Sequence, residues 1–600
     1  MRHRIFIFDL LLICSIILYG QDNILICSKI ESNSAEKTKE ILLKNESYTS
    51  VDFVDINLDI ILENEDLSLQ LGDRIIPISK ERIEARGINN FVFVGSNNEG
   101  SRVLISVLGN DIQGVIETNE EVFTIETVGE HQYVLITVDY SMLSEACDNL
   151  QEEDVRSGFD DADSHHHDSD IDNNNDITSS AILKAASEYD CKIRVLVLYT
   201  PSARSSVSDI KNTILTAVAL TNQSFINSQI NYRIELVYAG QTNYTESGFT
   251  TDLSRFRTSG DGYMDEVHTL RDKYSADVCV LLINDCSLCG YAAGIGVTAD
   301  NAFCEVSTCG TCVTSNYSFG HEIGHLLGCR HDPYVDPRTT PFAYGHGYVD
   351  PSNTWRTIMA YKKACGSCPR LQYWSNPNVN YGGVPMGTVA NNNNSRVWNE
   401  RSNAVMAFKQ PATNVTFTSS DMPNTTQYAD VIAKQNISTS GTVNTNSGNT
   451  LNMRAGNSIT LQPGFSVQTG AEFSAVIENI DDCEECAAKN SKVIVQNVPE
   501  EYDEQADVQI ESISDFSYSV FPDTSNELMN ITYSLDTQKS LSIELVDLFG
   551  QIIKTILPKH DQQAGNYTLQ IPLSDLSTGS YFLTISSNNH KKTEKIIINK

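Results

Sequence analysis

Apolar and polar residues alternate in short runs along residues 23–148, and turn residues separate these runs. Because successive side chains of a strand point to opposite faces of a sheet, this alternation predicts half-buried strands. Little helical periodicity follows residue 45, so the segment is expected to form a β-rich domain of its own. The predicted strands span residues 51–61, 91–95, 102–108, 122–128 and 133–138.

The pattern changes after residue 190, where continuous apolar runs alternate with stretches of helical spacing. Alternation of strand and helix predicts an α/β region, in which helices pack on a twisted, largely parallel sheet. This region is assigned to residues 178–412. Its predicted strands span 192–199, 231–238 and 277–283, and its predicted helices span 206–226 and 262–274.

Two further β segments follow the α/β region. Glycines punctuate very short β runs between residues 413 and 489 at near-regular spacing, which predicts stacked rungs or a small sandwich. Residues 490–516 are polar and acidic and are predicted to be a linker. Strong alternation in residues 517–600 predicts a small all-β sandwich.

An acidic segment separates the first β domain from the α/β region. Residues 151–176 hold ten acidic side chains and one basic one, together with three consecutive histidines. Such a segment cannot bury enough apolar surface to offset its ordering entropy, so residues 151–177 are predicted to be an exposed linker. Residues 168–172 resemble part of a calcium loop but lack its glycine and closing glutamate, so a structural Ca²⁺ has no support here.

The first twenty residues indicate export. Arg2 and Arg4 precede an apolar run over residues 5–19, and Gly20 offers a small residue for cleavage. This is the pattern of a secretory signal peptide, assigned to residues 1–20. An N-terminal anchor is the alternative, although the run is short for a membrane span. No other stretch approaches a spanning length, so the mature protein is expected to have no membrane span.

The charge of the chain bears on its partners. Forty-two Lys and Arg against 77 Asp and Glu give a net charge of −35, which repels phosphate backbones and argues against binding to nucleic acid. The length of 600 residues exceeds what one core usually supports and agrees with several domains.

The cysteines form a clustered set. Ten of the fifteen lie between Cys191 and Cys368, and in an exported protein such a set predicts disulfides. Cys286-x2-Cys289 and Cys309-x2-Cys312 also have the spacing of a zinc ribbon, so this alternative stays open beside the disulfides. The pairing does not follow from the sequence.

The stretch His321-Glu-Ile-Gly-His325-Leu-Leu-Gly328-Cys-Arg-His331 carries the candidate chemistry. Histidines four residues apart share one face of a helix, and a glycine after the helix lets the chain turn back to present a third imidazole. Three imidazoles leave one position open for water, which is the arrangement of a single catalytic Zn²⁺. Glu322, beside the first ligand, is the candidate general base for that water.

The eleven-residue motif resembles the metzincin metalloproteases, and the sequence Arg356-Thr-Ile-Met359-Ala-Tyr361 resembles their Met-turn. Asp332, directly after the third histidine, resembles the reprolysin (adamalysin) branch. The resemblance covers about residues 190–410 and implies a twisted mixed sheet with an active-site helix. It implies that Met359 lies beneath the metal, that Tyr361 lies near the zinc or the oxyanion, and that residues 289–297 form an edge strand that pairs with substrate.

The flanking β domains carry resemblances of their own. Residues 21–150 resemble a reprolysin-type propeptide, whose cysteine thiolate can hold the zinc and keep the enzyme latent. Cys147 and Cys27 are the candidates for such a switch, and a Cys27–Cys147 disulfide is the alternative. Residues 517–600 resemble the sorting domain of the bacterial type IX secretion system. This implies that the secretion machinery is a partner and that the protein travels through the periplasm to the cell surface or the medium.

The sequence therefore predicts a secreted zinc endopeptidase that hydrolyses extracellular proteins and peptides. A surface adhesin with a degenerate protease domain is the alternative from another class, and the intact ligands, base and Met-turn argue against it. A zinc hydrolase acting on a non-peptide bond is a third possibility that no residue favours.

Overall fold

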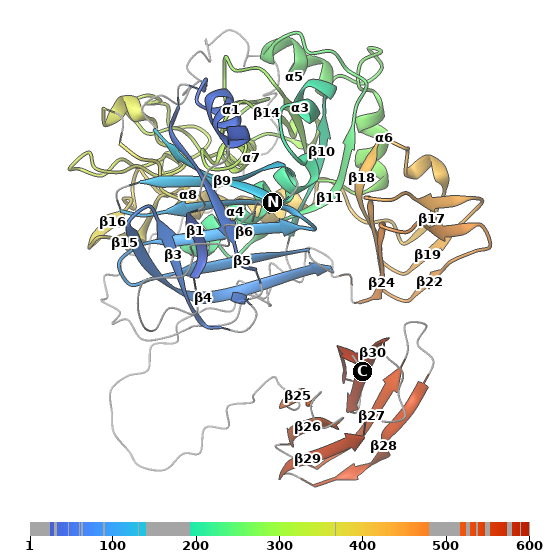
Figure 1. Cartoon of the computed structure of the whole chain (residues 1–600). Coiled ribbons are helices and arrows are strands. Elements are labelled where there is room, and N and C mark those ends of the chain that lie inside the picture. Colours follow the sequence, from blue (N-terminus) through green and yellow to red (C-terminus); the bar gives the residue numbers. More distant parts are fainter. Residues whose placement is uncertain are drawn as a thin grey trace, which may run out of the picture. The chain divides into compact units, whose positions relative to one another are not determined.

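The computed structural model describes residues 24–139, 192–480 and 517–598, apart from short gaps within these ranges. The predicted signal peptide, the two linkers and Cys147 lie outside the described residues. The chain divides into two compact units, residues 1–494 and 495–600 (Figure 1). Within the described residues, no helix is long and apolar enough to cross a membrane.

The first β domain is a closed barrel of nine strands in the order β1-β2-β9-β8-β7-β6-β5-β4-β3. Its interior is filled by apolar side chains such as Leu69, Phe93 and Ile105, which are fully buried. Closure of the sheet leaves no strand edge exposed. The strands are β1 (Ile24–Ser28), β2 (Tyr48–Ile56), β3 (Asp66–Leu71), β4 (Arg74–Gly87), β5 (Asn90–Ser96), β6 (Arg102–Leu108), β7 (Asp111–Glu117), β8 (Val122–Gly129) and β9 (Gln132–Val138), and helix α1 spans Asn33–Leu42.

The α/β region is built on an eight-stranded sheet in the order β13-β14-β12-β10-β11-β18-β21-β24. Its four central strands, β14, β12, β10 and β11, run parallel, as the sequence pattern predicts, and β13 and β18 pair antiparallel to them. The first predicted strand is confirmed at its full length as β10. The bounds are β10 (Lys192–Tyr199), β11 (Arg233–Gln241), β12 (Val278–Ile283), β13 (Gly290–Ala292), β14 (Phe303–Ser307), β18 (Thr426–Ala433), β21 (Thr450–Ala455) and β24 (Glu472–Ile477).

The helices of this region follow the predicted pattern, but two of them begin later than predicted. The helix expected from residue 206 begins at Ile210. The helix expected from residue 262 begins four residues later, at Glu266. Gly260 and Gly262 have φ values of 80° and 86°, and Asp265 accepts hydrogen bonds from both of their amides, so this stretch forms a loop instead of a first turn. The helices are α3 (Pro201–Ser205), α4 (Ile210–Asn227), α5 (Phe249–Arg257), α6 (Glu266–Lys273), α7 (Ser318–Leu327) and α8 (Asn394–Met406), with 3₁₀ turns at Ala299–Asn301, Lys362–Ala364 and Ser419–Asp421.

The short-strand segment consists of stacked parallel rungs, one of the two predicted arrangements. Tyr428 pairs with Thr450 and Thr450 with Glu472, so the rungs repeat every 22 residues (450 − 428 = 472 − 450 = 22). The segment is not a module apart from the α/β region, because β18 pairs with β11 and three of its strands extend the large sheet. This addition covers an edge that the parallel sheet would otherwise expose. Its other strands are β17 (Asn414–Phe417), β19 (Asn436–Thr439), β20 (Val443–Thr445), β22 (Ser458–Thr460) and β23 (Phe465–Val467), and a separate hairpin pairs β15 (Asn376–Tyr381) with β16 (Val384–Met386).

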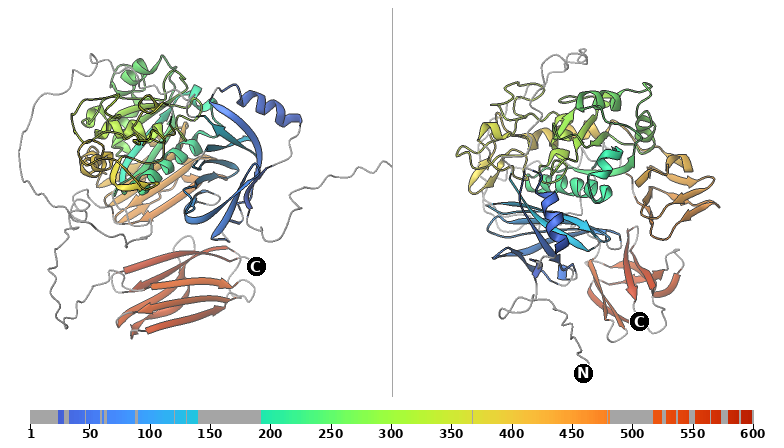
Figure 2. Two further views of the ribbon diagram at one scale, coloured as in Figure 1. Left: turned by 90° about the vertical axis from the view of Figure 1, so that its left-hand side faces the viewer. Right: turned by 45° about the horizontal axis from the view of Figure 1, so that its top comes forward.

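The barrel packs against helix α4 of the α/β region, as Figure 2 shows. Val92, Leu104 and Val115 of the barrel belong to the same buried apolar cluster as Ile214 and Val218 of α4. The buried side chain of Asn212 adds polar contacts: Ser106 Oγ donates to its Oδ1 at 2.8 Å, and its Nδ2 donates to the carboxylate of Asp111 at 2.7 Å. The barrel and helix α4 therefore share one buried apolar cluster, beside the separate core inside the barrel.

The second unit is an all-β sandwich, as predicted, with sheets ordered β25-β26-β29 and β28-β27-β30-β31. Fully buried residues such as Ile531, Leu541 and Ile585 form its own core. Its strands are β25 (Ser517–Asp523), β26 (Leu528–Leu535), β27 (Lys539–Val546), β28 (Ile552–Gln562), β29 (Gly565–Pro572), β30 (Gly579–Ser587) and β31 (His590–Ile598).

Candidate metal centre and active site

Helix α7 and the turn after it bring the three histidines together. His321 and His325 lie one helical turn apart on α7, and the helix ends at Gly328, whose φ of 118° reverses the chain. A Cβ at Gly328 would lie 2.8 Å from the ring of Phe342, so only glycine fits this turn. The chain then returns and places His331 against both helical ligands.

The three imidazoles converge on one point. Nε2 of His331 lies 3.2 Å from Nε2 of His321 and 3.0 Å from Nε2 of His325. Among the described residues, these histidines are the one group of His, Cys, Asp or Glu side chains whose ligand atoms gather closely enough to hold a metal ion. The predicted zinc ligands are thus brought together, whereas residues 168–172, where a structural Ca²⁺ was considered, lie outside the described residues.

Hydrogen bonds fix which nitrogens face the centre. Nδ1 of His321 lies 3.0 Å from the carbonyl oxygen of Ile358, and Nδ1 of His325 lies 2.8 Å from that of Cys329. A carbonyl only accepts, so both Nδ1 atoms donate and both Nε2 atoms carry lone pairs. His331 Nε2 carries at most one proton and cannot satisfy both of these acceptors well. A cation among the three nitrogens satisfies them all, so the residues fit a metal ion.

Burial keeps the three rings neutral. It lowers the pKa of His321 and His331 well below the usual value, with the neighbouring ligand His325 as the next cause, and it brings the pKa of His325 to about 4. A neutral imidazole is the form that binds a metal ion.

The Met-turn residues lie beside this centre. Met359 is fully buried, and its Sδ approaches to 3.4 Å of the position a Cβ would take on Gly324 of helix α7. The ring of Tyr361 lies 4.1 Å from the ring of His331, measured between centroids. Its backbone amide donates to Asp332 Oδ2 at 2.9 Å, so the aspartate after the third histidine ties that loop to the Met-turn.

Glu322 lies against strand β13 at the edge of the sheet. Its side chain is 1% exposed, and a Cβ on Gly290 would lie 2.5 Å from its Oε1. Glycine at this position therefore lets the carboxylate pass close to the strand backbone. The sequence predicts the edge strand but not this contact, because the spacing of the motif contains no information about which strand approaches the helix.

The cysteines depart in part from the predicted framework. Cys286 pairs with Cys309, Cys289 with Cys312, and Cys365 with Cys368, which excludes the zinc-ribbon alternative. Cys279, Cys304 and Cys329 are buried free thiols. Cys279 and Cys304 point to opposite sides of the sheet, into different apolar clusters, so they cannot pair with each other.

Sequence reasoning missed Arg370, which lies eleven residues after Met359. Its guanidinium is 3% exposed and its Nη1 donates to the carbonyl oxygen of Asn316 at 2.8 Å and to Asn316 Oδ1 at 3.1 Å, just before helix α7. No motif signals a lone arginine in a loop, and only the folded structure brings it to the segment just before helix α7.

Comparison with known proteins agrees with this geometry. Residues 189–375 match Metallo-peptidase family M12, and residues 519–599 match the secretion system C-terminal sorting domain. A peptidyl-Asp metalloendopeptidase of Stenotrophomonas maltophilia (strain R551-3) is 41% identical over 52% of this chain and 72% of its own length. One from Xanthomonas campestris pv. campestris is 36% identical over 63% of this chain and 90% of its own length. Among solved structures, metalloproteinase-II from Bacteroides fragilis shows slight similarity, with 12% identity, coverage of 48% and 84% of the two chains, and a TM-score of 0.29.

These relatives share more than a third of their aligned residues with this chain over more than two thirds of their own length. The matched M12 segment also contains the converging histidines and Glu322. The chain therefore belongs to metallopeptidase family M12 and is a metalloendopeptidase that carries a secretion sorting domain.

Proposed function

We propose that this metalloendopeptidase is a zinc enzyme that cleaves proteins at peptide bonds next to aspartate. The convergence of three neutral imidazoles carries the metal assignment, since His321, His325 and His331 form an all-nitrogen set. Three such ligands leave the fourth position of a tetrahedral zinc for water or substrate. The aspartate preference comes from the printed names of the relatives, which are peptidyl-Asp metalloendopeptidases.

The metal ion and the residues around it have separate roles in the proposed reaction. The zinc ion supplies Lewis acidity, which polarises the carbonyl group of the peptide bond and acidifies water. Glu322 is the general base: it takes the proton of the attacking water and delivers it to the leaving amine nitrogen. Tyr361, whose ring contacts that of His331, is proposed to donate to the oxyanion. Met359 packs below the histidines and keeps the loop in position.

We propose that residues 21–150 are the propeptide and that the activating cut falls in the 151–177 linker. The shared apolar core of the barrel and α4 predicts that the barrel stays bound after this cut, because its departure would expose Ile214 and Val218. Whether Cys147 reaches the metal is tested by Cys147→Ser. A thiolate on zinc predicts premature activity, and a disulfide with Cys27 predicts only a less stable barrel.

Residues 517–600 are proposed to direct the chain through the type IX secretion machinery, from the periplasm to the cell surface or the medium. This follows from the match of residues 519–599 to the sorting domain. The substrates are then proteins and peptides outside the cell.

The test is digestion of a denatured protein by the purified mature enzyme, with the cut sites identified by mass spectrometry. Cuts clustered next to aspartate, loss of cleavage after chelation, and recovery with one equivalent of Zn²⁺ per chain are the expected results. Cleavage that survives complete metal removal would contradict the metal assignment, and cuts with no enrichment at aspartate would contradict the specificity.

A further inference from the structure

Arg370 lies where the segment after the Met-turn passes helix α7. Backbone hydrogen bonds fix the residues on either side of it. Leu371 donates its amide to the carbonyl oxygen of Arg356 at 2.8 Å, and Arg356 donates its amide to the carbonyl oxygen of Pro369 at 3.0 Å. Leu371 packs in an apolar cluster with Trp355. Arg370 instead reaches Asn316, two residues before α7 begins.

Asn316 joins this arginine to the edge of the sheet and to helix α7. Its Nδ2 lies 3.3 Å from Sγ of Cys289, the residue before strand β13, and 3.2 Å from Oγ of Ser318 in the first turn of α7. Arg370 is thus held at the junction of the edge strand and the active-site helix, one turn before His321.

The charge of Arg370 is not compensated by the residues that the structure describes. Its Nε is buried without a hydrogen-bond partner, and no carboxylate of the described part of the chain forms an ion pair with it. A buried cation without a counterion is costly, and natural proteins seldom keep one without a use for it. An anion that enters with the substrate would complete this guanidinium.

The arginine lies close enough for its charge to be felt at the metal centre. The pKa values of His321 and His331 are lowered first by burial, then by neighbouring ligand histidines, and further by the positive charge of Arg370. Together with the contact to Asn316, this places the guanidinium on the side of the site where helix α7 begins.

Two other arginines near the site show the contrast. Arg356 is 1% exposed, but its Nε donates to the carbonyl oxygen of Cys368 at 3.0 Å and its Nη1 to that of Ala360 at 2.6 Å. Arg338 also acts on His331, and its Nε donates to Asp336 Oδ1 at 2.8 Å. Of the three, Arg370 is the one whose buried guanidinium keeps a donor without a hydrogen-bond partner among the described residues.

We propose that Arg370 is the residue that determines specificity, by binding the side-chain carboxylate of an aspartate that flanks the cleaved bond. This inference rests on the proposed function, whose aspartate preference it explains in terms of one residue. A guanidinium offers a fork of donors that matches a carboxylate, and Asn316 holds the fork in place through Nη1. Because the group is almost fully buried, a substrate seated at the site delivers the anion, and free salt does not.

The experiment compares quenched fluorogenic peptides that differ only in the residue next to the cleaved bond. That residue is Asp or the isosteric Asn, on the side that the digestion map identifies, and both ends of each peptide are blocked so that no terminal carboxylate competes. The measured quantity is the ratio of kcat/KM for the Asp peptide to kcat/KM for the Asn peptide. It is determined for the wild type, Arg370→Gln, Arg370→Lys and the matched control Arg338→Gln.

The ratio is expected to fall at least ~100-fold in R370Q, mostly because turnover of the Asp peptide drops, since a site built to bind a polar group discriminates strongly against its loss. R370K retains the charge but not the fork, so its ratio should lie between those of R370Q and the wild type. R338Q should keep the wild-type ratio. Each variant is also checked for bound zinc and for its melting temperature.

An R370Q ratio within about threefold of the wild type overturns the assignment of Arg370. If R370Q does not fold, R370K decides: a ratio at least tenfold below the wild type supports the assignment, and an unchanged ratio overturns it. A wild-type enzyme that cleaves but does not prefer the Asp peptide contradicts the proposed specificity itself, so the two failures are distinguishable.

Discussion

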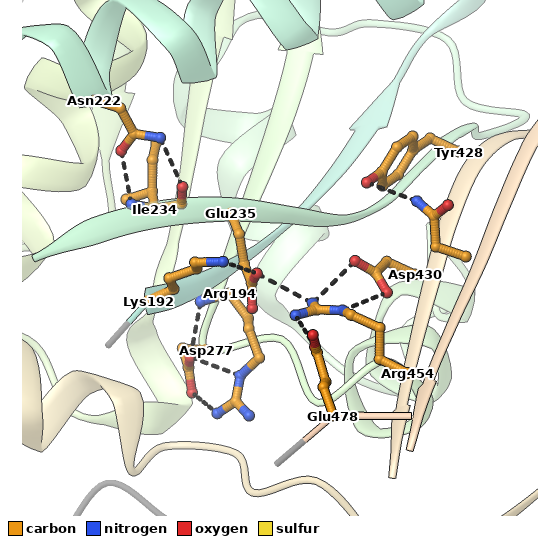
Figure 3. Close-up of polar contacts among 11 residues, drawn as sticks. Lys192, Arg194, Asn222, Ile234, Glu235, Asp277, Tyr428, Asp430, Arg454 and Glu478 are labelled. Atoms are coloured by element: carbon orange, nitrogen blue, oxygen red, sulfur yellow. Dashed lines mark hydrogen bonds and ion pairs between the residues drawn. The ribbon is translucent and has the colours of Figure 1, made fainter. Parts of the chain in front are cut away.

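The two ends of the eight-stranded sheet differ in whether their buried ionisable side chains have partners. At the end formed by β18, β21 and β24, Arg454 contacts Glu235, Asp430 and Glu478 at 3.1, 2.9 and 3.4 Å (Figure 3). At the end formed by β14 and β13, the described residues supply no partner for Nε of Arg370 or for either carboxylate oxygen of Glu305. At the first end Arg454 has oppositely charged partners, whereas at the second end Arg370 and Glu305 have none among the described residues.

The central strands also contain a buried ion pair. Arg194 of β10 donates through Nε and Nη2 to Asp277 at 3.1 and 3.0 Å, and its backbone amide also donates to that carboxylate (Figure 3). Such closed sets hold the strands in register. The buried groups without partners lie instead around the candidate active site: Glu305 is near Glu322, and Arg370 is held just before helix α7. We infer from this difference that charge compensation separates the structural end of the sheet from the functional end.

The largest expected effect is at the functional end. Glu322→Gln should retain zinc, because the three histidines remain, but it removes the base and should lower kcat/KM at least ~100-fold. The melting temperature should stay near that of the wild type, which calorimetry and metal analysis measure. A variant that holds zinc and cleaves at the wild-type rate would show that Glu322 is not the base.

At the structural end of the sheet, a substitution is expected to lower stability and to leave activity unchanged. Arg454→Met leaves Glu235 and Asp430 buried without their shared cation and should destabilise the first unit by about 3 kcal/mol, while kcat per folded enzyme stays unchanged. Denaturant unfolding measures the loss. Glu478→Gln is the matched control, since that carboxylate is 41% exposed and its pairing should contribute less than about 1 kcal/mol. A large loss of kcat in the Arg454 variant would contradict the separation of the two ends.

Glu305 gives a pH-dependent test of the same comparison. It is fully buried in β14, and burial raises the pKa of its carboxyl well above the usual range, with Asp252 and Glu322 adding negative charge nearby. The folded protein therefore keeps the proton, while the unfolded chain releases it above its usual pKa near 4.5. The contribution of Glu305 to the free energy of unfolding is therefore greatest below pH 4.5 and is lost as the pH rises towards the folded pKa.

Glu305→Gln should remove this loss. Its stability advantage over the wild type should be absent near pH 4 and should grow by up to about 1.4 kcal/mol per pH unit above 4.5, the slope for one proton. Thermal melts of both proteins from pH 4 to pH 8 provide the measurement. Parallel melting curves at every pH would show that Glu305 is ionised in the folded protein.

The sequence could predict the local part of the site and not the long-range part. His321, His325 and Gly328 follow from helical spacing and a turn, and His331 follows from the return of the chain. Arg370 and Glu305 could not be found in this way, because the isolation of a charge depends on what the whole fold fails to place beside it. The motif therefore predicts the metal centre, whereas the groups around it require the structure.

The same limit applies to the fold. The strands and helices of the α/β region follow from local periodicity, and β10 matches its predicted bounds. The joining of β18 to β11 does not, because the short rungs have the same local pattern in a free module as in a sheet extension. Likewise, the position of a cysteine in the sequence does not reveal which face of a sheet it occupies, so Cys279 and Cys304 could not be separated from the disulfide set.

The smallest effect on catalysis is expected from the second unit. Residues 495–600 form a compact unit with their own apolar core, and the metal centre lies entirely within the first unit. A separate core folds by itself, so deletion of residues 517–600 should leave kcat/KM and the zinc content of the purified enzyme unchanged.

The deletion should instead block export of the protein, because the match to a sorting domain covers residues 519–599. In the native host the truncated chain should still cross the inner membrane and then accumulate in the periplasm, which cell fractionation measures. Normal export of the truncated chain would refute the sorting role, and loss of activity in the purified truncation would place the sandwich within the working enzyme.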